Sequence, residues 1–376
     1  MSLSAAAMAR LDHIADRSGT RDLMGRMEVS GCGEIHLRSD TEHRLRAVVA
    51  IHSTRLGPAI GGCRFVSYAD TREAINDAMR LARCMSYKSA LFSLPYGGGK
   101  AVLIKPEAPF DREAVFESFG EFVESLGGRF LTAVDSGTSV SDMDTIARRT
   151  RFVMSTSVSH GGHGDPSPCT AIGVRRGIEA AVRFKFRRSD LEGLRVLIQG
   201  AGHVGYHLAR ELDAQGAQVH IYDTDERRMQ RCVDEFGCEA VRSRELWRLR
   251  TDVFAPCALG GVIDAKLAAG LQTDIVAGAA NNPLGRSREA LTLQRRNVLY
   301  APDFVINAGG LMHVVTRDRA AVERKIHGIH DMLMEIFERA ALRREPPLWL
   351  AESIAERAIR SRSRNAMDPA PAAATQ

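Results

Sequence analysis

The sequence is poor in the features that mark secreted, metal-stabilised and membrane-spanning proteins. Its seven cysteines among 376 residues are scattered and form no CxxC pair, which argues against a disulfide framework and against a structural zinc site. No apolar run approaches the length of a membrane span, and the first residues lack the apolar core of a secretory signal. We therefore expect a cytoplasmic protein with no membrane partner.

Aromatic residues are also scarce, at 6%, and this bears on the basic charge of the chain. The net charge is +5 and the pI is near 8.9, values that could suggest nucleic acid as a partner. The arginines are spread along the chain, however, and their one cluster, at 357–364, lacks aromatic residues on which bases could stack. His160 and His163 stand in a glycine loop without a third ligand beside them. We therefore predict neither a nucleic-acid partner nor a metal site.

The patterns of apolar residues predict an α/β fold of two domains with a cleft between them. A length of 376 residues is enough for two cores, and 44% hydrophobic and 26% charged residues are ordinary for a globular protein. The small polar residues at 155–167 are the expected hinge. The expected parts are a first domain at 1–155, a second domain at 156–344, a C-terminal helix at about 345–366 that joins the first domain, and a disordered tail at 367–376.

Single elements follow from the same patterns. Strands are expected at 34–39, 45–52, 101–104, 130–134, 194–199, 218–222, 252–255, 274–277 and 298–301. Helices are expected at 1–30, 71–86, 111–126, 142–149, 170–182, from Val204 onward, and at 319–340. A loop with three glycines and a proline is expected at 57–64.

A lysine behind a run of glycines is the first candidate site. Lys100 follows Gly97–Gly99 directly, and a mostly apolar run joins it to Lys88. Glycines let another group approach the main chain, and apolar surroundings with a second ammonium nearby favour the neutral amine, which is a usable base. A phosphate-binding P-loop is excluded, because Leu94 and Ala101 stand where that motif needs glycine and Ser or Thr. A glycine turn before a buried strand, with Lys100 reaching solvent, is an equal alternative.

The second candidate site is a glycine-rich turn between an expected strand and an expected helix. Its glycines permit a tight turn and the close approach of a pyrophosphate, for which the helix N-terminus offers free N–H groups. Asp223 follows about 20 residues later, and its carboxylate can accept both ribose hydroxyls. It would repel a 2′-phosphate, as would Asp225, so NAD is predicted rather than NADP. The motif comprises Gly200, Ala201, Gly202, His203, Val204, Gly205 and Asp223.

Loops of small and polar residues follow the three expected strands at 252–255, 274–277 and 298–301. Such loops bind ligands in parallel sheets. Asn281 and Asn307 in these loops could orient a carboxamide or a ribose, although asparagines also commonly cap turns.

A series of stretches, in order from about residue 30 to 365, resembles the leucine/phenylalanine/valine dehydrogenases of the glutamate dehydrogenase superfamily. They are GPAIGGCR (57–64), MSYKSA (85–90), LPYGGGKAV (94–102), TAVDSGTSVSDMD (132–144), APCALGG (255–261), VAGAANN (276–282) and LYAPDFVINAGG (299–310). The resemblance implies a homo-oligomeric, NAD-dependent enzyme that reversibly deaminates an L-amino acid to its 2-oxo acid and ammonia. It implies that the domain at 1–155 is the substrate and oligomerisation domain and that the domain at 156–344 is a Rossmann-type NAD-binding domain. It implies that Lys88 binds the substrate carboxylate, that Lys100 activates water as general base, and that Asp135 relays protons. The expected cofactor contacts also include Thr170, Cys257, Ala258, Asn281 and Asn307.

The expected substrate is apolar. Relatives that act on glutamate have a lysine where this chain has Ile60, and a substrate carboxylate beside Ile60 would stay unpaired at a cost of several kcal/mol. The substrate-binding set is expected to be Lys88, Ile60, Gly61, Gly62, Ala133, Leu311 and Val314. A leucine, valine or isoleucine type of substrate is the first expectation. Residues 311–313 depart from the usual wall and could suit an aromatic one, since a methylene decides only about 1–3 kcal/mol.

Three departures from the family pattern, at Asp165, at Ser136 and after Val315, concern the rim of the site and the subunit contacts. Two other functions stay open on the sequence. One is a biosynthetic relative that condenses the imine or oxo acid, and the other is a non-catalytic nucleotide sensor.

Overall fold

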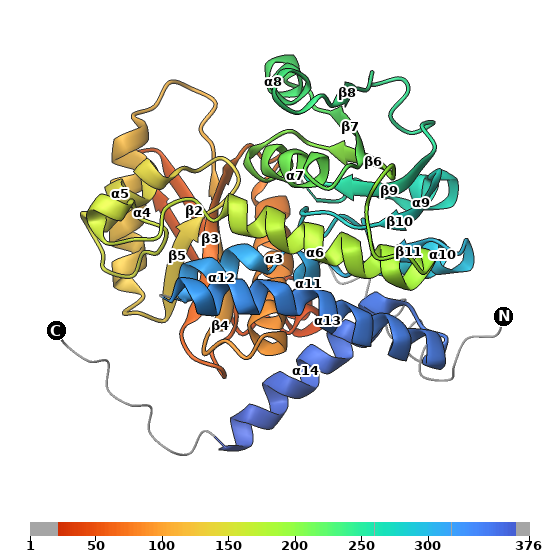
Figure 1. Ribbon diagram of the computed structural model, residues 1–376. Coiled ribbons are helices and arrows are strands. Elements are labelled where there is room, and N and C mark those ends of the chain that lie inside the picture. Colours follow the sequence, from red (N-terminus) through yellow and green to blue (C-terminus); the bar gives the residue numbers. More distant parts are fainter. Residues whose placement is uncertain (1–21, 259, 317, 366–376) are drawn as a thin grey trace. The chain divides into compact units, whose positions relative to one another are not determined.

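The computed structural model describes residues 22–258, 260–316 and 318–365, and Figure 1 shows their helices and strands. The tail expected at 367–376 and most of the helix expected at 1–30 lie outside these ranges; α2 (Leu23–Ser30) is the described remainder. The chain divides into two compact units. The N-terminal unit holds Ser30–Thr138, Thr145–Val153 and the residues from Glu352, and the central unit holds Ser139–Asp144, Met154–Ala351 and the residues up to Val29.

The N-terminal unit is built on a mixed sheet of five strands in the order β1-β2-β4-β3-β5. These are β1 (Glu34–Asp40), β2 (Leu45–Ser53), β3 (Ala59–Val66), β4 (Gly97–Ile104) and β5 (Phe130–Val134). The pairs β1–β2 and β2–β4 are antiparallel, whereas β3 runs parallel to β4 and to β5. Every residue of β4 is buried, which is typical of a strand covered on both faces.

Helices α3 (Thr71–Leu91), α4 (Arg112–Ser125) and the later part of α14 (Pro347–Asn365) complete this unit, and α5 (Val140–Ala147) follows β5. Asp70 caps α3 by accepting a hydrogen bond of 2.8 Å from the Glu73 N–H, and Asp111 caps α4 in the same way. α14 contacts α3 through the Tyr87 hydroxyl, which donates to Glu356 over 2.8 Å, and through Arg83, which lies 3.5 Å from Glu352.

Two expectations about glycines in this unit are wrong. Residues 57–64 are not a loop, because β3 begins at Ala59 and runs between β4 and β5. Gly97–Gly99 lie inside β4 and form no turn. Their small size serves the protein's own packing: a Cβ on Gly98 would clash with the backbone of Ser86 in α3, and a Cβ on Gly61 would clash with the Gly99 carbonyl.

The central unit is built on a sheet of six parallel strands in the order β11-β10-β9-β6-β7-β8. The strands are β6 (Arg195–Gln199), β7 (Gln218–Tyr222), β8 (Glu239–Ala240), β9 (Thr251–Pro256), β10 (Thr273–Val276) and β11 (Leu299–Tyr300). The chain moves outward from β6 to β8 and then returns to β9 on the other side of β6. This change of direction is the switch point at which doubly wound sheets bind ligands. The predicted fold class, two α/β domains of which one is of Rossmann type, is confirmed.

The helices of this unit include several that the sequence patterns did not predict. They are α6 (Ser167–Phe186), α7 (His203–Asp213), α8 (Glu226–Phe236), α9 (Ala265–Gly270), α10 (Glu289–Arg295), α11 (Asp303–Ile306), α12 (Gly309–Val315) and α13 (Arg319–Arg343), with the short η1 (Val158–His160) before α6. Asn307 thus lies between two short helices, not in a loop at a strand end. The apolar stripe of α13 packs on α6, since Cβ atoms on Gly173 and Gly177 would crowd Ile329 and Leu333.

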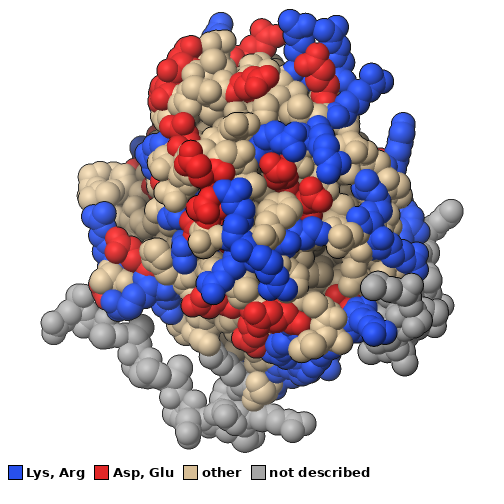
Figure 2. Space-filling view, turned by 45° about the vertical axis from the view of Figure 1, so that its right-hand side comes forward, with Lys and Arg blue, Asp and Glu red and all other residues tan. Residues whose placement is uncertain are grey.

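Charged side chains of both signs cover the surface. Figure 2 shows acidic side chains standing among the basic ones on the face that it draws. Many arginines have an acidic partner on the same helix, as Arg231 has in Glu235 at 2.7 Å. Among the described helices, none combines the length and the apolar character that crossing a lipid bilayer requires.

Candidate active site

One face of the N-terminal sheet gathers the residues predicted to carry the chemistry. Side chains alternate along a strand, so Ile60, Gly62 and Arg64 share a face of β3. The register aligns Ile60 with Gly98 of β4 and Gly62 with Ala133 of β5. Gly98 lies against α3. This face is therefore the one that α3 covers.

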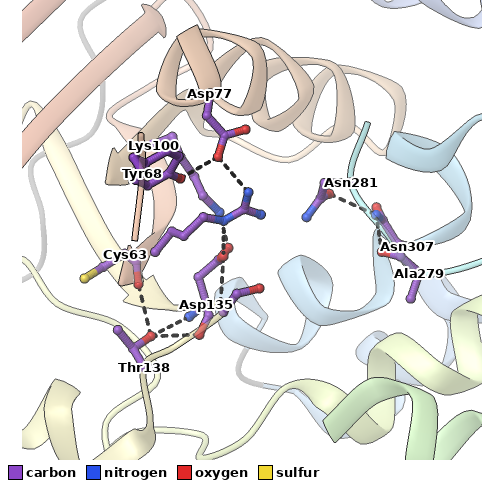
Figure 3. Close-up of polar contacts among 11 residues, drawn as sticks. Cys63, Tyr68, Asp77, Lys100, Asp135, Thr138, Ala279, Asn281 and Asn307 are labelled. Atoms are coloured by element: carbon purple, nitrogen blue, oxygen red, sulfur yellow. Dashed lines mark hydrogen bonds and ion pairs between the residues drawn. The ribbon is translucent and has the colours of Figure 1, made fainter. Parts of the chain in front are cut away.

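Lys100 and Asp135 form a buried ion pair on this face. Lys100 lies in β4 and is 2% exposed, and its Nζ contacts Oδ2 of Asp135, the residue that follows β5 (Figure 3). Gly62 provides the space for this carboxylate, because a Cβ at that position would stand 2.8 Å from Asp135 Oδ2. The alternative in which Lys100 reaches solvent is therefore wrong.

Asp135 is held as a carboxylate. Burial by itself would raise the pKa of Asp135, but the positive charges of Lys100 and Arg64, with hydrogen bonds from Lys100 and from the Ser136 N–H, lower it well below its usual range. The sequence led us to expect dry and positive surroundings for Lys100. The surroundings are dry, but its direct partner is an anion, which sequence spacing could not place there.

Arg64 is a site residue that the sequence analysis missed. Arg64 is 5% exposed, and its guanidinium contacts two carboxylates, with Nε 3.2 Å from Asp135 Oδ1 and Nη1 2.8 Å from Asp77 Oδ2. Asp77 lies in α3, and the Tyr68 hydroxyl also donates to its Oδ2 over 2.7 Å (Figure 3). Arg64 ends the stretch GPAIGGCR, and strand alternation from Gly62 would have placed it on the site face. We had treated 57–64 as a loop, to which alternation does not apply.

Thr138 fixes the loop that carries Asp135. Its Oγ1 accepts the Asp135 N–H over 2.8 Å and lies 3.0 Å from the carbonyl of Cys63 in β3, to which it can donate. The departure at Ser136 leaves this arrangement intact, because Ser136 contacts Asp135 Oδ1 through its backbone N–H, at 2.7 Å.

The other predicted residues of this unit are buried nearby. Lys88 lies in the last turn of α3 and is 6% exposed, two residues beyond Ser86, whose backbone faces Gly98. Ile60 and Ala133 are buried in β3 and β5. Together with Gly61 and Gly62, they bring every predicted substrate residue of this unit to the same three strands and to α3.

The glycine-rich turn of the central unit has the backbone features that a dinucleotide needs. Gly200 has a φ of +111°, a conformation that favours glycine, and a Cβ on Gly205 would clash with the Gly200 carbonyl. Gly202 precedes α7 without a side-chain cap, and the space in which its Cβ would stand is open. The first turn of α7, from His203, therefore presents uncapped N–H groups beside an open backbone.

Asp223 ends β7 beside this turn. Its Oδ2 accepts the Ala201 N–H over 2.6 Å, and its Oδ1 accepts the Asp225 N–H over 2.8 Å. Cys257 and Ala258 follow β9 and stand against Gly200, since a Cβ on that glycine would lie 2.7 Å from the Ala258 nitrogen. The structure thus brings the predicted glycines, Asp223, Cys257 and Ala258 together at the carboxyl ends of β6, β7 and β9.

Asn281 and Asn307 form a second polar group in the central unit. Asn307 donates from Nδ2 to Asn281 Oδ1 and to the Ala279 carbonyl, both at 2.9 Å (Figure 3). Within the described residues, the buried Oδ1 of Asn307 has no hydrogen-bond partner. It is an acceptor available to a donor such as a carboxamide NH₂.

Thr170, Leu311 and Val314 lie in helices of the central unit. Thr170, in α6, adjoins α12, because a Cβ on Gly310 would clash with its hydroxyl, and α12 carries the buried Leu311 and Val314. The departure at Asp165 has a local role, since its Oδ1 accepts the Ser167 N–H at the start of α6 over 2.9 Å. Of the departure after Val315, Arg317 lies outside the described residues.

Comparison with known proteins identifies the family to which the chain belongs. Residues 32–152 match the family described as "Glu/Leu/Phe/Val dehydrogenase, dimerisation domain", and residues 220–316 match "Glutamate/Leucine/Phenylalanine/Valine dehydrogenase". A leucine dehydrogenase of Thermoactinomyces intermedius is 41% identical over 89% of this chain and 92% of its own length. The chain belongs to the glutamate/leucine/phenylalanine/valine dehydrogenase family. It is an amino-acid dehydrogenase, an oxidoreductase that acts on CH–NH₂ donors.

Relatives in this dehydrogenase family differ in the amino acid that their names give. A valine dehydrogenase of Streptomyces virginiae is 42% identical over 87% of this chain and 93% of its own length. The solved structure of L-tryptophan dehydrogenase from Nostoc punctiforme matches with a TM-score of 0.72 and 35% identity. The match covers 91% of this chain and 100% of the tryptophan dehydrogenase chain. Membership of the family thus leaves the substrate to be argued from the site.

Proposed function

We propose that this dehydrogenase catalyses the NAD-dependent, reversible oxidative deamination of an apolar L-amino acid of the leucine, valine or isoleucine type. The observation that carries the proposal is the buried Lys100–Asp135 pair, which shares one sheet face with the apolar Ile60, 0% exposed. The pair can move a proton in dry surroundings, and Ile60 offers no charge to a substrate side chain.

The lysines divide the work on the substrate. Lys88 would bind the substrate carboxylate, because a buried ammonium gains much from an anionic partner. After the α-amine has become an iminium, Lys100 as the neutral amine would take a proton from water, and the hydroxyl would add to Cα. In the collapse of the carbinolamine, its nitrogen would gain a proton and leave as ammonia, while its hydroxyl loses a proton and becomes the carbonyl of the 2-oxo acid. The contact between Lys100 Nζ and Asp135 Oδ2 would let the proton pass between these two side chains, so that Asp135 delivers it to the leaving nitrogen and Lys100, neutral again, accepts the proton of the hydroxyl.

The central unit fits a dinucleotide by its own geometry. The open backbone at Gly202 and the uncapped N-terminus of α7 suit a pyrophosphate, and the acceptor of Asn307 suits a carboxamide. Bound NAD would supply the acceptor for the hydride that Cα loses. We assign cofactor binding to Gly200, Ala201, Gly202, His203, Val204, Gly205, Asp223, Thr170, Cys257, Ala258, Asn281 and Asn307. Substrate contact is assigned to Lys88, Ile60, Gly61, Gly62, Ala133, Leu311 and Val314.

We further propose a homo-oligomer. The family matched by residues 32–152 is described as a dimerisation domain, which supports assembly through the N-terminal unit.

Substrate preference is tested by NADH formation from a panel of L-amino acids. We expect leucine, valine or isoleucine to give the highest kcat/KM, and glutamate to be at least about 100-fold worse, because its side-chain carboxylate would be buried unpaired. Preference for phenylalanine or tryptophan would assign the enzyme to aromatic substrates, and preference for glutamate would refute the argument from Ile60. The reverse reaction with a 2-oxo acid, run with ammonia and then with a second amine in its place, tests the biosynthetic alternative. Absence of NADH with every amino acid would refute the proposal.

Cofactor choice is tested at Asp223. Asp223→Ser is expected to lower the preference for NAD over NADP by about 10- to 100-fold, because the carboxylate no longer repels a 2′-phosphate at a few ångströms. The measurement is kcat/KM for both cofactors. Asp234→Ser is the matched control. Asp234 is exposed in α8, so its replacement should leave the ratio of kcat/KM for NAD to that for NADP unchanged. An unchanged ratio in Asp223→Ser would show that another group sets the choice.

A further inference from the structure

Arg64 divides the Asp135 carboxylate between two cations. Oδ1 of Asp135 accepts from Arg64 Nε at 3.2 Å and from the Ser136 N–H at 2.7 Å, which leaves Oδ2 to Lys100. The side chain of Arg64 is 6% exposed and that of Asp135 is 12% exposed, so water screens this contact weakly. Arg64 therefore fixes the orientation in which Oδ2 faces Lys100.

Arg64 is itself anchored from behind. Its Nη1 lies 2.8 Å from Asp77 Oδ2, and Tyr68 donates to the same oxygen over 2.7 Å. Asp77 lies in α3 and Tyr68 in the loop between β3 and α3, so the chain Tyr68–Asp77–Arg64–Asp135 ties the helix to the end of β5. A planar guanidinium suits such a bridge, because its donors point in fixed directions.

A buried lysine–aspartate pair without a third charge has a weakness as a catalytic device. When its lysine gives up a proton, the aspartate loses its only counter-charge in a dry site and tends to keep a proton instead of passing it on. A guanidinium stays protonated at every pH at which proteins are folded. A cation that cannot titrate is thus placed on the oxygen of Asp135 that Lys100 does not use.

We propose that Arg64 is a positioning residue of the reaction: anchored by Asp77, it holds Asp135 toward Lys100 and keeps Asp135 a carboxylate in the resting site, so that Asp135 holds a proton only while passing it on. This inference rests on the proposed function and adds to it a residue that acts through Asp135. Arg64 itself touches neither substrate nor cofactor in this role.

The charges around Asp135 agree with this role. Lys100 faces it from β4 and Arg64 from β3, and behind Arg64 stand Asp77 and Tyr68. Burial raises the pKa of Asp135, and the two cations together lower it below the usual range. The pKa of Arg64 is held above its ordinary value, because the attraction of Asp135 and Asp77 outweighs burial. Without Arg64, burial would be opposed only by Lys100 and by the hydrogen bond from the Ser136 N–H, and the pKa of Asp135 should rise.

Activity profiles test the proposal with Arg64→Gln and Arg64→Lys. Arg64→Gln keeps a hydrogen-bond donor but loses the charge, so the acid limb of its kcat/KM profile should move upward by about one pH unit or more. Arg64→Lys keeps the positive charge but loses the simultaneous contact of the guanidinium with Asp135 and Asp77. The acid limb of its kcat/KM profile should therefore stay near that of the wild type, while kcat falls. Arg149→Gln is the matched control, since Arg149 pairs with Glu117 at 2.6 Å on the surface of the same unit. It should change neither quantity.

A second readout does not require activity. A carboxylate whose folded pKa is lowered stabilises the protein above its unfolded pKa, and this stabilisation disappears as pH falls through the folded value, sooner when the folded pKa is lowered less. The gap in thermal midpoint between wild type and Arg64→Gln should therefore be constant above about pH 4 and narrow only in stronger acid. If Arg64→Gln does not fold, infrared difference spectra of the wild type against Asp135→Asn replace it. They should show no protonated Asp135 between about pH 6 and 9.

The outcomes separate this inference from the proposed function. Equal acid limbs in wild type and Arg64→Gln, with a stability gap that does not depend on pH, would reduce Arg64 to a packing role and overturn the proposal. So would a protonated Asp135 in the infrared spectra. A wild type that oxidises no amino acid would refute the proposed function. The stability and infrared measurements would still test whether Asp135 is ionised.

Discussion

Lys100→Met is expected to lower kcat for the preferred amino acid by about 10²- to 10⁴-fold, the range that general acid–base groups contribute. Methionine has a similar length and suits a position that is 2% exposed, and Asp135 keeps Arg64 as its counter-charge. The loss should therefore reflect the missing amine. Initial rates of NADH formation at saturating amino acid and NAD measure it, and binding of NAD alone should be unchanged, because Lys100 lies in the other unit.

Lys105→Met is the matched control for this variant. Lys105 is exposed just beyond the end of β4, so its replacement should leave kcat within about twofold. Full activity in Lys100→Met would end the assignment of Lys100 as general base, and an equal loss in both variants would point to a general defect of the strand.

Asp135→Asn should affect both activity and stability. The asparagine cannot take a proton, so we expect kcat to fall by about 10²- to 10⁴-fold. It also leaves Lys100 without its anionic partner and Arg64 with Asp77 alone, inside a site that water hardly reaches. Removal of one member of a buried ion pair costs about 3–5 kcal/mol, which should appear as a lower midpoint in thermal or urea unfolding. Asp111→Asn is the control, because asparagine caps a helix as well as aspartate does.

The stability loss in Asp135→Asn should have a defined pH dependence. A carboxylate whose folded pKa is lowered stabilises the protein above its unfolded pKa of about 4, and this stabilisation disappears as pH falls through the folded value. The difference in unfolding free energy from the wild type should thus be constant between about pH 8 and 5 and should shrink only in stronger acid. A difference that already shrinks near neutral pH would show that Asp135 is not held as a carboxylate.

Local signals in the sequence were sufficient for much of the fold. The strand at 130–134 and the strand at 218–222 begin and end as predicted, because small apolar runs between turn residues define them. The glycine-rich turn at 200–205 lies between a strand and a helix, as predicted. Local backbone geometry accounts for its glycines: Gly200 has a positive φ, and a side chain on Gly205 would clash with the Gly200 carbonyl. Helix α8 was missed although its apolar residues Met229, Cys232, Val233 and Phe236 recur at helical spacing; of these only Cys232 is buried.

The strand β3 shows what sequence patterns could not supply. Its two adjacent glycines and its proline-led start are typical of a loop, and only the neighbours explain them. Gly61 makes room for the backbone of β4 and Gly62 for the carboxylate of Asp135, and both neighbours are distant in the sequence. Arg64 was missed for this reason, and with it the charge balance of the site. The sequence motifs pointed to Lys88 and Lys100 as candidates, whereas the contact of Lys100 with Asp135 depends on how the strands are ordered in the sheet.

Helix α14 has a consequence for how the chain is made. Its residues from Glu352 onward belong to the same compact unit as β1, although nearly the whole central unit is encoded between them. A ribosome must therefore release Glu356 before the Tyr87 hydroxyl on α3 can meet its acceptor. The unit that contains β1 therefore cannot be completed until every strand of the central unit has been synthesised and α14 can pack onto α3.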